Sequence, residues 1–226
     1  MKKLVVANWK DHLAPSEALA WLETFRRGYR PLAVAEVVLA VPFLVMREAG
    51  TLLEETAGVS LAAQAVSPFP PGGYTGATPA RWLRGLADRV LVGHRERRHY
   101  FHEDEQSVAA QVRESLAVGL QPILCTDRSE APRQLAALDH DELDRVLLAY
   151  TPANAVDLEI AAPTQDIAAV VSTLGEMSGG RPVLYGGGVN ESNAAALLAM
   201  DGMAGIMVGR GCLDATEFLR LLERLA

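Results

Sequence analysis

The feature that most constrains the fold is an alternation, repeated eight times, between short apolar runs and longer segments. The runs are nearly continuous in Val, Leu, Ile and Ala, which is the pattern of parallel strands buried on both faces. The predicted strands lie near Leu4–Asn8, Val37–Pro42, Val59–Gln64, Arg89–Gly93, Gln121–Cys125, Arg145–Tyr150, Arg181–Gly186 and Met203–Gly209.

The longer segments between these runs have helical periodicity. Val108, Val112 and Leu116, for example, recur at every fourth residue, which places them on one face of a helix. Eight strand–helix pairs in 226 residues predict one domain, residues 1–226, folded as a closed (β/α)₈ TIM barrel of class α/β. An open doubly wound sheet is the alternative, because counting strands does not prove closure.

Two connections differ from this regular pattern. The segment between the fifth and sixth strands has room for only one short helix, around Glu130–Leu138. The segment Ser67–Gly76, rich in Pro and Gly, follows the third strand. It is too short and too aromatic for a linker between domains, so we expect an ordered, protruding loop.

The composition limits the classes of binding partner and indicates the cellular compartment. A net charge of -7 argues against nucleic acid or an anionic membrane as a partner. Cys125 and Cys212 are the only cysteines, which suits a reducing compartment, and we interpret both as small apolar fillers. The apolar run in MKKLVVANWKDH is too short for a signal peptide or a membrane span. We therefore expect a cytoplasmic protein.

Polar residues and glycines gather where predicted strands end. In a barrel, active sites lie at the carboxyl ends of the strands, and glycine-rich backbone after strands 7 and 8 is a recurrent phosphate site. The candidate site residues are Asn8 and Lys10, His94, Arg95 and Glu96, Thr151, Gly186, Gly187 and Gly188, and Gly209, Arg210 and Gly211. Their placement predicts a pocket for a small anionic or phosphorylated ligand, and we expect no metal ion and no cofactor.

Several of these segments, taken in chain order, resemble the motifs of the triosephosphate isomerase family. The matching segments are Ala7–Lys10, Tyr74–Gly76, Val92–Arg98, Ala149–Pro152, Tyr185–Val189 and Val208–Gly211. The resemblance extends from residue 5 to beyond residue 210, and the chain is shorter than typical members, mainly between Cys125 and Tyr150.

The resemblance implies roles for four residues. Lys10 would supply positive charge to the substrate, and Asn8 would help to orient the Lys10 side chain. His94 would polarise the substrate carbonyl as a neutral imidazole, with a helix N-terminus lowering its pKa; this family is an established example of such tuning. Glu96 would pair with Lys10 and hold it in place.

The same resemblance reveals a departure at the reactive centre. Thr151 occupies the position of the family's catalytic glutamate, and a hydroxyl cannot replace a carboxylate as a general base near neutral pH. In the family, a serine contacts that glutamate when the site is empty, and here that position is Arg95. Two positions that would contact each other have therefore both changed.

The expected active-site lid, residues 152–163, departs as well. Asn154 stands at the family's tryptophan position, and Asp157 and Glu159 stand in its glycine–threonine–glycine phosphate clamp. Gly188 replaces the serine that usually ends the seventh loop's glycine run. Side chains in a clamp tend to block the close approach of backbone N–H groups to a phosphate.

Three functions stay open at this point. The chain could be an active triosephosphate isomerase with a substitute base such as Glu159. It could be an enzyme of altered specificity, in which Arg95 takes a substrate carboxylate or a second phosphate. It could bind a ligand or a partner without turnover. We expect weak or no triose-phosphate isomerisation, and a homo-oligomer, dimer or tetramer, formed through the loop that carries Thr75.

Overall fold

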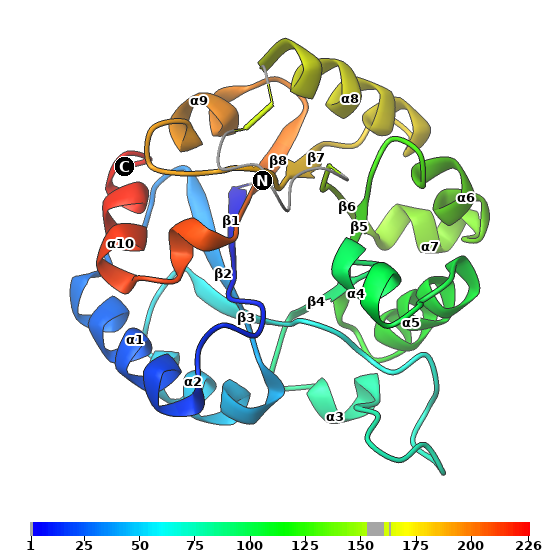
Figure 1. Cartoon of the computed structure of the whole chain (residues 1–226), viewed down its shortest axis with the longest axis horizontal. Coiled ribbons are helices and arrows are strands. Elements are labelled where there is room, and N and C mark those ends of the chain that lie inside the picture. Colours follow the sequence, from blue (N-terminus) through cyan, green and yellow to red (C-terminus); the bar gives the residue numbers. More distant parts are fainter. Residues whose placement is uncertain (1, 153–160, 163) are drawn as a thin grey trace.

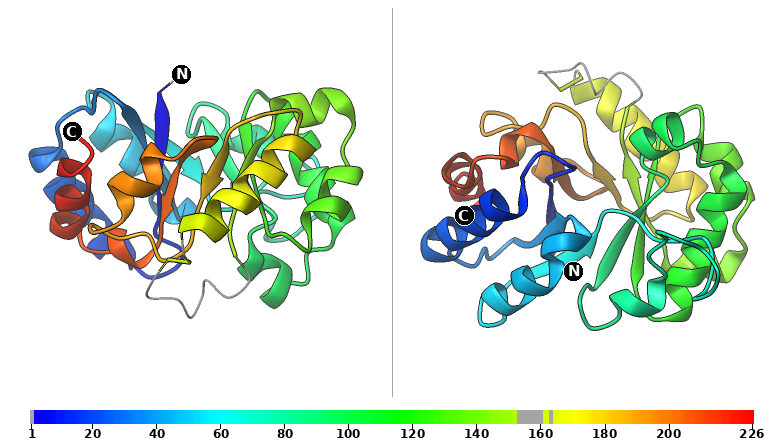
Figure 2. Two further views of the ribbon diagram at one scale, coloured as in Figure 1. Left: turned by 90° about the horizontal axis from the view of Figure 1, so that it is seen from above. Right: turned by 60° about the horizontal axis from the view of Figure 1, so that its bottom comes forward.

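The computed structural model describes residues 2–152, 161–162 and 164–226. Its parallel strands form one closed barrel in the order β1-β2-β3-β4-β5-β6-β7-β8, and helices surround the barrel (Figures 1 and 2). The predicted (β/α)₈ barrel is thus confirmed, and the open sheet is wrong. The strands are β1 (Lys3–Asn8), β2 (Ala35–Val41), β3 (Val59–Ala63), β4 (Arg89–Val92), β5 (Gln121–Thr126), β6 (Leu147–Tyr150), β7 (Val183–Tyr185) and β8 (Met203–Val208).

The described helices follow the strands in turn. They are α1 (Pro15–Gly28), α2 (Met46–Leu53), α3 (Ala80–Leu83), α4 (Arg95–Tyr100), α5 (Glu105–Ala117), α6 (Ala131–Ala136), α7 (His140–Arg145), α8 (Thr164–Met177), α9 (Ala194–Ala199) and α10 (Ala215–Glu223), with 3₁₀ turns η1 (Phe43–Val45) and η2 (Arg210–Cys212). Across the described residues, no helix is long and apolar enough to cross a membrane.

One expectation about the helices is wrong. Between β5 and β6 the chain forms two short helices, α6 and α7, instead of one. The cause is a capping box at Asp139: its carboxylate accepts a hydrogen bond from the Glu142 N–H at 2.8 Å, and the Glu142 carboxylate accepts one from the Asp139 N–H at 2.9 Å. This reciprocal pair satisfies backbone donors that would otherwise be unpaired, so a new helix begins there.

Buried side chains form two separate cores because successive residues of a strand point to opposite faces. Leu4, Val6, Ile123 and Leu184 belong to the cluster that fills the barrel interior. Val5 belongs, with the buried faces of the helices, to a larger cluster outside the strands. The barrel is therefore a packed core, and ligand space is left only at its ends.

Closure of the barrel depends on a glycine in β8. Gly205 pairs with Leu4 of β1, and a Cβ on Gly205 would lie 2.0 Å from the Leu4 carbonyl oxygen. No side chain fits at that distance, so only glycine lets the first and last strands meet here.

An aromatic cluster fixes the chain just before the site. Trp9, directly after β1, is fully buried and packs edge-on against Trp21 of α1 at 4.7 Å between ring centroids. Trp21 in turn stacks on Phe25 and contacts Phe218 of α10. Aromatic pairs of this kind contribute about 0.5–1.5 kcal/mol beyond their area burial. They anchor the segment that carries Asn8 and Lys10.

The segment after β3 forms a loop that protrudes from the barrel beside α3, as expected (Figure 1). Its base is held by a hydrogen bond from the Ser67 N–H to the Thr78 carbonyl, at 2.8 Å. Near its tip the rings of Phe69 and Tyr74 stack at 4.4 Å between centroids. Both rings stay largely exposed, at 47% and 43% of their surface.

Candidate active site

A cavity of about 330 Å³ lies where β1, β4, β6, β7 and β8 end. Every candidate residue predicted from the sequence lines it. The structure thus brings together side chains and glycines from five strand ends, although each came from a separate motif. Pockets of this size typically hold small-molecule ligands.

Lys10 is held on three sides. Its backbone adopts a left-handed conformation, with φ of 53°, which is strained for a residue with a side chain. The Asn8 side chain accepts a hydrogen bond from the Lys10 N–H at 3.0 Å, and Gln64 donates to the Lys10 carbonyl at 2.8 Å. The Lys10 ammonium lies 2.5 Å from a carboxylate oxygen of Glu96. Asn8 therefore bonds the backbone of Lys10 rather than its side chain.

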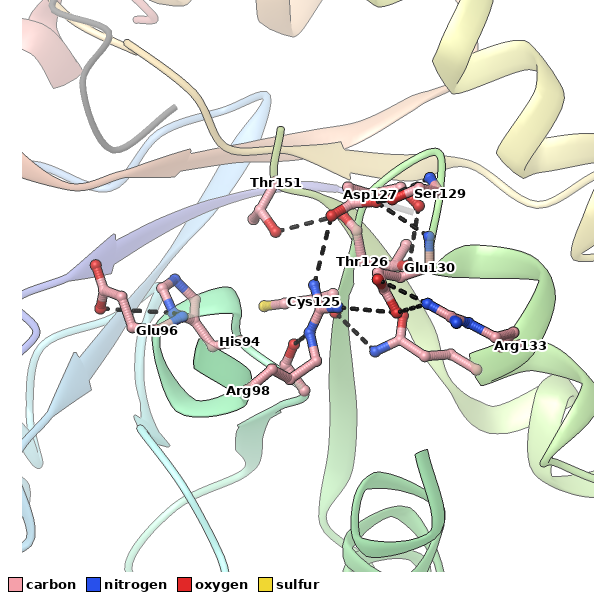
Figure 3. Close-up of polar contacts among 12 residues, drawn as sticks. His94, Glu96, Arg98, Cys125, Thr126, Asp127, Ser129, Glu130, Arg133 and Thr151 are labelled. Carbon is pink, nitrogen blue, oxygen red and sulfur yellow. Dashed lines mark hydrogen bonds and ion pairs between the residues drawn. The ribbon is translucent and has the colours of Figure 1, made fainter. Parts of the chain in front are cut away.

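His94 is the N-cap residue of α4, and its Nδ1 accepts a hydrogen bond from the Glu96 N–H at 3.3 Å (Figure 3). Burial is the largest cause that lowers the His94 pKa to about 4; Glu96 opposes this shift, while Lys10, Arg98 and Arg97 reinforce it. Desolvation is thus the main cause of a shift whose direction the resemblance predicted. At neutral pH the imidazole carries no charge, and because Nδ1 accepts, its proton is on Nε2.

Thr151 follows β6 and is buried. Its N–H donates to the Thr126 carbonyl at 2.8 Å, and its hydroxyl donates to the same oxygen at 3.3 Å (Figure 3). Its methyl group lies against Gly186, where an added Cβ would meet it at 3.4 Å. The Thr151 backbone therefore extends the β5–β6 pairing by one residue, and its methyl group packs against Gly186 after β7.

The next carboxylate beyond Thr126, that of Asp127, is already engaged. It accepts hydrogen bonds from the Ser129 N–H and hydroxyl and from the Glu130 N–H, at 2.6–3.0 Å (Figure 3). Burial alone would raise the Asp127 pKa, but these hydrogen bonds and the charge of Arg98 together lower it. A carboxylate stabilised in this way holds the start of α6 and is a poor proton acceptor.

The side chains of Arg97 and Arg98 both form ion pairs. The Arg98 guanidinium donates to the Gly93 carbonyl at 2.9 Å and lies 3.3 Å from Glu130, and Arg97 pairs with Glu103 at 2.7 Å. The Arg98 side chain is only 15% exposed. Arg98 therefore ties the segment after β4, which carries His94, to the start of α6, and Arg97 ties α4 to the turn before α5.

The glycine run after β7 is shaped by its neighbours. The Gly186 N–H donates to the Tyr150 carbonyl at 2.9 Å, so this amide is already used within the barrel. A Cβ on Gly187 would lie 2.8 Å from the Tyr185 hydroxyl, too close for any side chain without displacement. Asn193 donates to the Gly188 carbonyl at 2.9 Å and fixes the end of the run.

Sequence reasoning missed several residues of the site. Val189, Asn190 and Met207 line the cavity, and Gln64 supports Lys10 from β3's end. Gln64 and Asn190 carried a usable signal, since Gln64 is a polar residue directly after a strand and Asn190 is a polar residue two positions after the glycine run. Val189 and Met207 carried none, because apolar residues are expected throughout the strands.

Neither cysteine lines the cavity. Cys125 and Cys212 are buried free thiols. Burial raises the pKa of Cys125 to about 12 and raises that of Cys212 as well, so neither forms a reactive thiolate at neutral pH. Among the described residues, no group of three or more His, Cys, Asp or Glu side chains could hold a metal ion.

Comparison with known proteins identifies the family of this chain. The triosephosphate isomerase family model matches residues 3–225. The chain belongs to the triosephosphate isomerase family. Relatives of this family include the triosephosphate isomerase of Paracidovorax citrulli, 34% identical with 100% of this chain and 99% of that protein covered. That of Coxiella burnetii is 33% identical, with coverage of 97% and 96%.

A solved structure supports the same relationship. The crystal structure of triosephosphate isomerase from Bartonella henselae superimposes with a TM-score of 0.83 and 26% sequence identity, and the match covers 99% of each chain. The barrel presents its cavity at the carboxyl ends of its strands. The lid positions Asn154, Asp157 and Glu159, which the sequence singled out, lie outside the described residues.

Proposed function

We propose that this protein binds a small anionic or phosphorylated ligand in the cavity at the carboxyl ends of the strands, and that it isomerises triose phosphates weakly or not at all. The cavity's shape, its glycine-lined wall at β7 and β8, and the ammonium of Lys10 support the binding. Membership of the triosephosphate isomerase family supports a phosphorylated ligand of about three carbons.

One observation carries the second half of the proposal. The Thr151 side chain, at the position where the family resemblance expects the base, is a hydroxyl that already donates to the Thr126 carbonyl. The only carboxylate among the described residues that line the cavity is that of Glu96, and it is paired with Lys10 at 2.5 Å. Without a positioned general base, the rate of proton abstraction falls by about 10²- to 10⁴-fold.

The ends of β1 and β4 carry the groups that would bind and polarise a ligand oxygen. The neutral His94 can donate from Nε2, and Lys10 supplies positive charge nearby. Together they would hold an oxygen on which negative charge develops. Asn8, Glu96 and Gln64 act on Lys10 and would be positioning residues.

The second candidate is an active triosephosphate isomerase, which the names of the relatives favour. It requires a carboxylate from elsewhere, and Glu159 is the one that the sequence suggests. An assay that couples triose-phosphate interconversion to a nicotinamide-dependent enzyme decides between the two. Turnover on the order of 10–10³ s⁻¹, which is ordinary for enzymes, would refute our proposal.

Ligand binding is tested separately from turnover. Inorganic phosphate, phosphoglycolate and small dicarboxylates should each be tried in thermal melting experiments, because a ligand that binds only the folded state raises its melting temperature. We expect stabilisation by at least one phosphorylated compound. If none of them changes the melting temperature, the protein is better interpreted as an interaction module that does not use this cavity.

We also propose a cytoplasmic homo-oligomer, a dimer or tetramer, formed through the loop that carries Thr75. The exposed, stacked rings of Phe69 and Tyr74 on this loop support the assembly, because exposed aromatic side chains are enriched at interfaces. Light scattering at micromolar concentration tests it. A monomer would contradict the proposal, and changing Tyr74 to Asp should shift an oligomer towards monomer.

A further inference from the structure

Arg95 is the residue of the cavity that the family's chemistry does not account for. It follows His94 as the first residue of α4, and it lines the cavity. The Nη1 atom of its guanidinium is buried and has no hydrogen-bond partner in the part of the chain that the structure describes. A buried donor of a charged group is costly to leave unpaired, so this atom is a place where a ligand acceptor would be stabilised.

The neighbours of Arg95 leave its charge uncompensated among the described lining residues. Glu96 is the one acid in that set, and it pairs with Lys10 at 2.5 Å. Thr151 is neutral, and its hydroxyl donates to the Thr126 carbonyl. The wall of the cavity formed by the ends of β4 and β6 therefore presents a cation without a counter-charge, in a protein whose net charge is -7.

The barrel topology sets the distance between this cation and the glycine-lined wall. In a closed barrel of eight strands, β4 and β8 lie on opposite sides. Arg95 follows β4, whereas Gly209 and Gly211 follow β8. Glycines at such a position let a phosphate approach the backbone. A ligand that uses both walls therefore carries two anionic groups, one at each end.

We propose that Arg95 binds the carboxylate of a small phosphorylated carboxylic acid whose phosphate lies at the glycine-lined wall. The proposal rests on the proposed function and specifies its ligand. A carboxylate is favoured over a second phosphate because Arg95 has a buried nitrogen without a partner among the described residues, and the Thr151 hydroxyl in the same cavity is engaged. A flat monoanion matches a single guanidinium, whereas a phosphate dianion needs several further donors.

Two ligands that differ only in the relevant group provide the test. Glycerol 3-phosphate and 3-phosphoglycerate share the phosphate and the middle carbon, and only the second carries a carboxylate. Isothermal titration calorimetry of the full-length protein should show that 3-phosphoglycerate binds on the order of tenfold tighter, as expected for one charge-assisted hydrogen-bonded contact. Inorganic phosphate serves as the third ligand.

Variants of Arg95 assign the preference to its side chain. Arg95→Gln should lose the preference for 3-phosphoglycerate and bind the two ligands with similar affinity. Arg95→Lys keeps the charge without the planar fork and should retain part of the preference. Arg220→Gln, which removes an exposed arginine of α10, is the matched control and should behave like the parent protein. Circular dichroism and thermal melting of Arg95→Gln check that it is folded.

The outcomes separate this inference from the proposed function. Equal affinity of the parent protein for both ligands would overturn the role of Arg95, while the phosphate-binding function would stand. A preference for 3-phosphoglycerate that survives in a folded Arg95→Gln variant would overturn it as well. If neither ligand nor inorganic phosphate binds, the proposed function itself is wrong, and the inference fails with it.

Discussion

Two groups of residues at the cavity, the Lys10–Glu96–His94 wall and the Arg95–Thr151 wall, differ in how their polar atoms are satisfied. On the wall formed by the ends of β1 and β4, the charges are paired: Lys10 contacts Glu96, and Glu96 donates its N–H to His94. On the wall that combines Arg95 and Thr151, the hydroxyl bonds only backbone, and an arginine nitrogen is buried without a partner among the described residues.

This difference indicates which part of the site is complete before a ligand arrives. In the Lys10–Glu96–His94 wall, the three residues pair with one another and need no ligand to complete their contacts. This suits groups that must keep a fixed geometry. Among the described residues the Arg95–Thr151 wall is incomplete, and we infer that a ligand group supplies the counter-charge. The first wall carries residues that the family resemblance predicts, and the second carries the two residues that depart from that resemblance.

The largest expected effect is on the rate of isomerisation, when a carboxylate base is introduced into the Arg95–Thr151 wall. Thr151→Glu combined with Arg95→Ser should raise triose-phosphate isomerisation by about 10²- to 10⁴-fold, because a positioned carboxylate contributes that much to proton abstraction. Thr151→Glu alone should gain much less, since a nearby arginine lowers a carboxyl pKa by about 1–3 units and weakens it as a base. The coupled assay with purified variants measures both.

The control for this pair is Thr151→Gln with Arg95→Ser, which has the same shape as the glutamate variant without its charge. It should stay at the parent rate. If Thr151→Glu alone is as active as the double variant, the two positions do not interact, and the contrast between the walls is weaker than we infer. No gain in a folded double variant would mean that residues other than the base limit the reaction.

A smaller effect is expected on the first wall, from the pH dependence of stability. The His94 pKa is about 4 in the folded protein and about 6.5 when unfolded. The unfolded state therefore binds a proton more readily, and stability is lost as the pH falls from 6.5 towards 4. Between pH 7.5 and pH 5 the loss should be about 2 kcal/mol, measured by denaturant unfolding.

Two variants isolate the contribution of His94. His94→Gln removes the buried titrating group, so its stability should change little over the same pH interval. His12→Gln removes an exposed histidine outside the cavity and should retain the slope of the parent protein. A parent protein that is equally stable at pH 7.5 and pH 5 would show that His94 is not buried in its neutral form.

The fold could be predicted from the sequence almost completely, because the period of the apolar runs reports directly on burial. Every predicted strand is present, with ends displaced by at most two residues, as at Arg145–Tyr150, where the strand begins at Leu147. Strand ends are poorly specified because buried side chains continue into the adjacent turns. The split into α6 and α7 was missed because it depends on the Asp139 capping box.

The sequence predicted which residues line the cavity, but it did not predict most of the contacts that their side chains make. Strand ends in a barrel converge, so polar residues there form one cavity whichever helices intervene. The pairing of Lys10 with Glu96 followed from the family resemblance. The sequence did not reveal that the Thr151 hydroxyl bonds to the Thr126 carbonyl, or that burial dominates the His94 pKa, because both depend on side-chain packing.

The smallest expected effect tests whether the paired wall limits the binding of anions. Glu96→Gln leaves the Lys10 ammonium without its counter-charge at 2.5 Å, so glycerol 3-phosphate should bind a few-fold tighter at low salt, and the gain should shrink as salt screens the charge. Glu223→Gln, an exposed acid of α10, is the matched control and should leave the affinity unchanged. Calorimetry at two ionic strengths measures both variants. Weaker binding by Glu96→Gln would instead mean that Glu96 is needed to hold Lys10 towards the ligand, and that the pairing positions Lys10 more than it neutralises it.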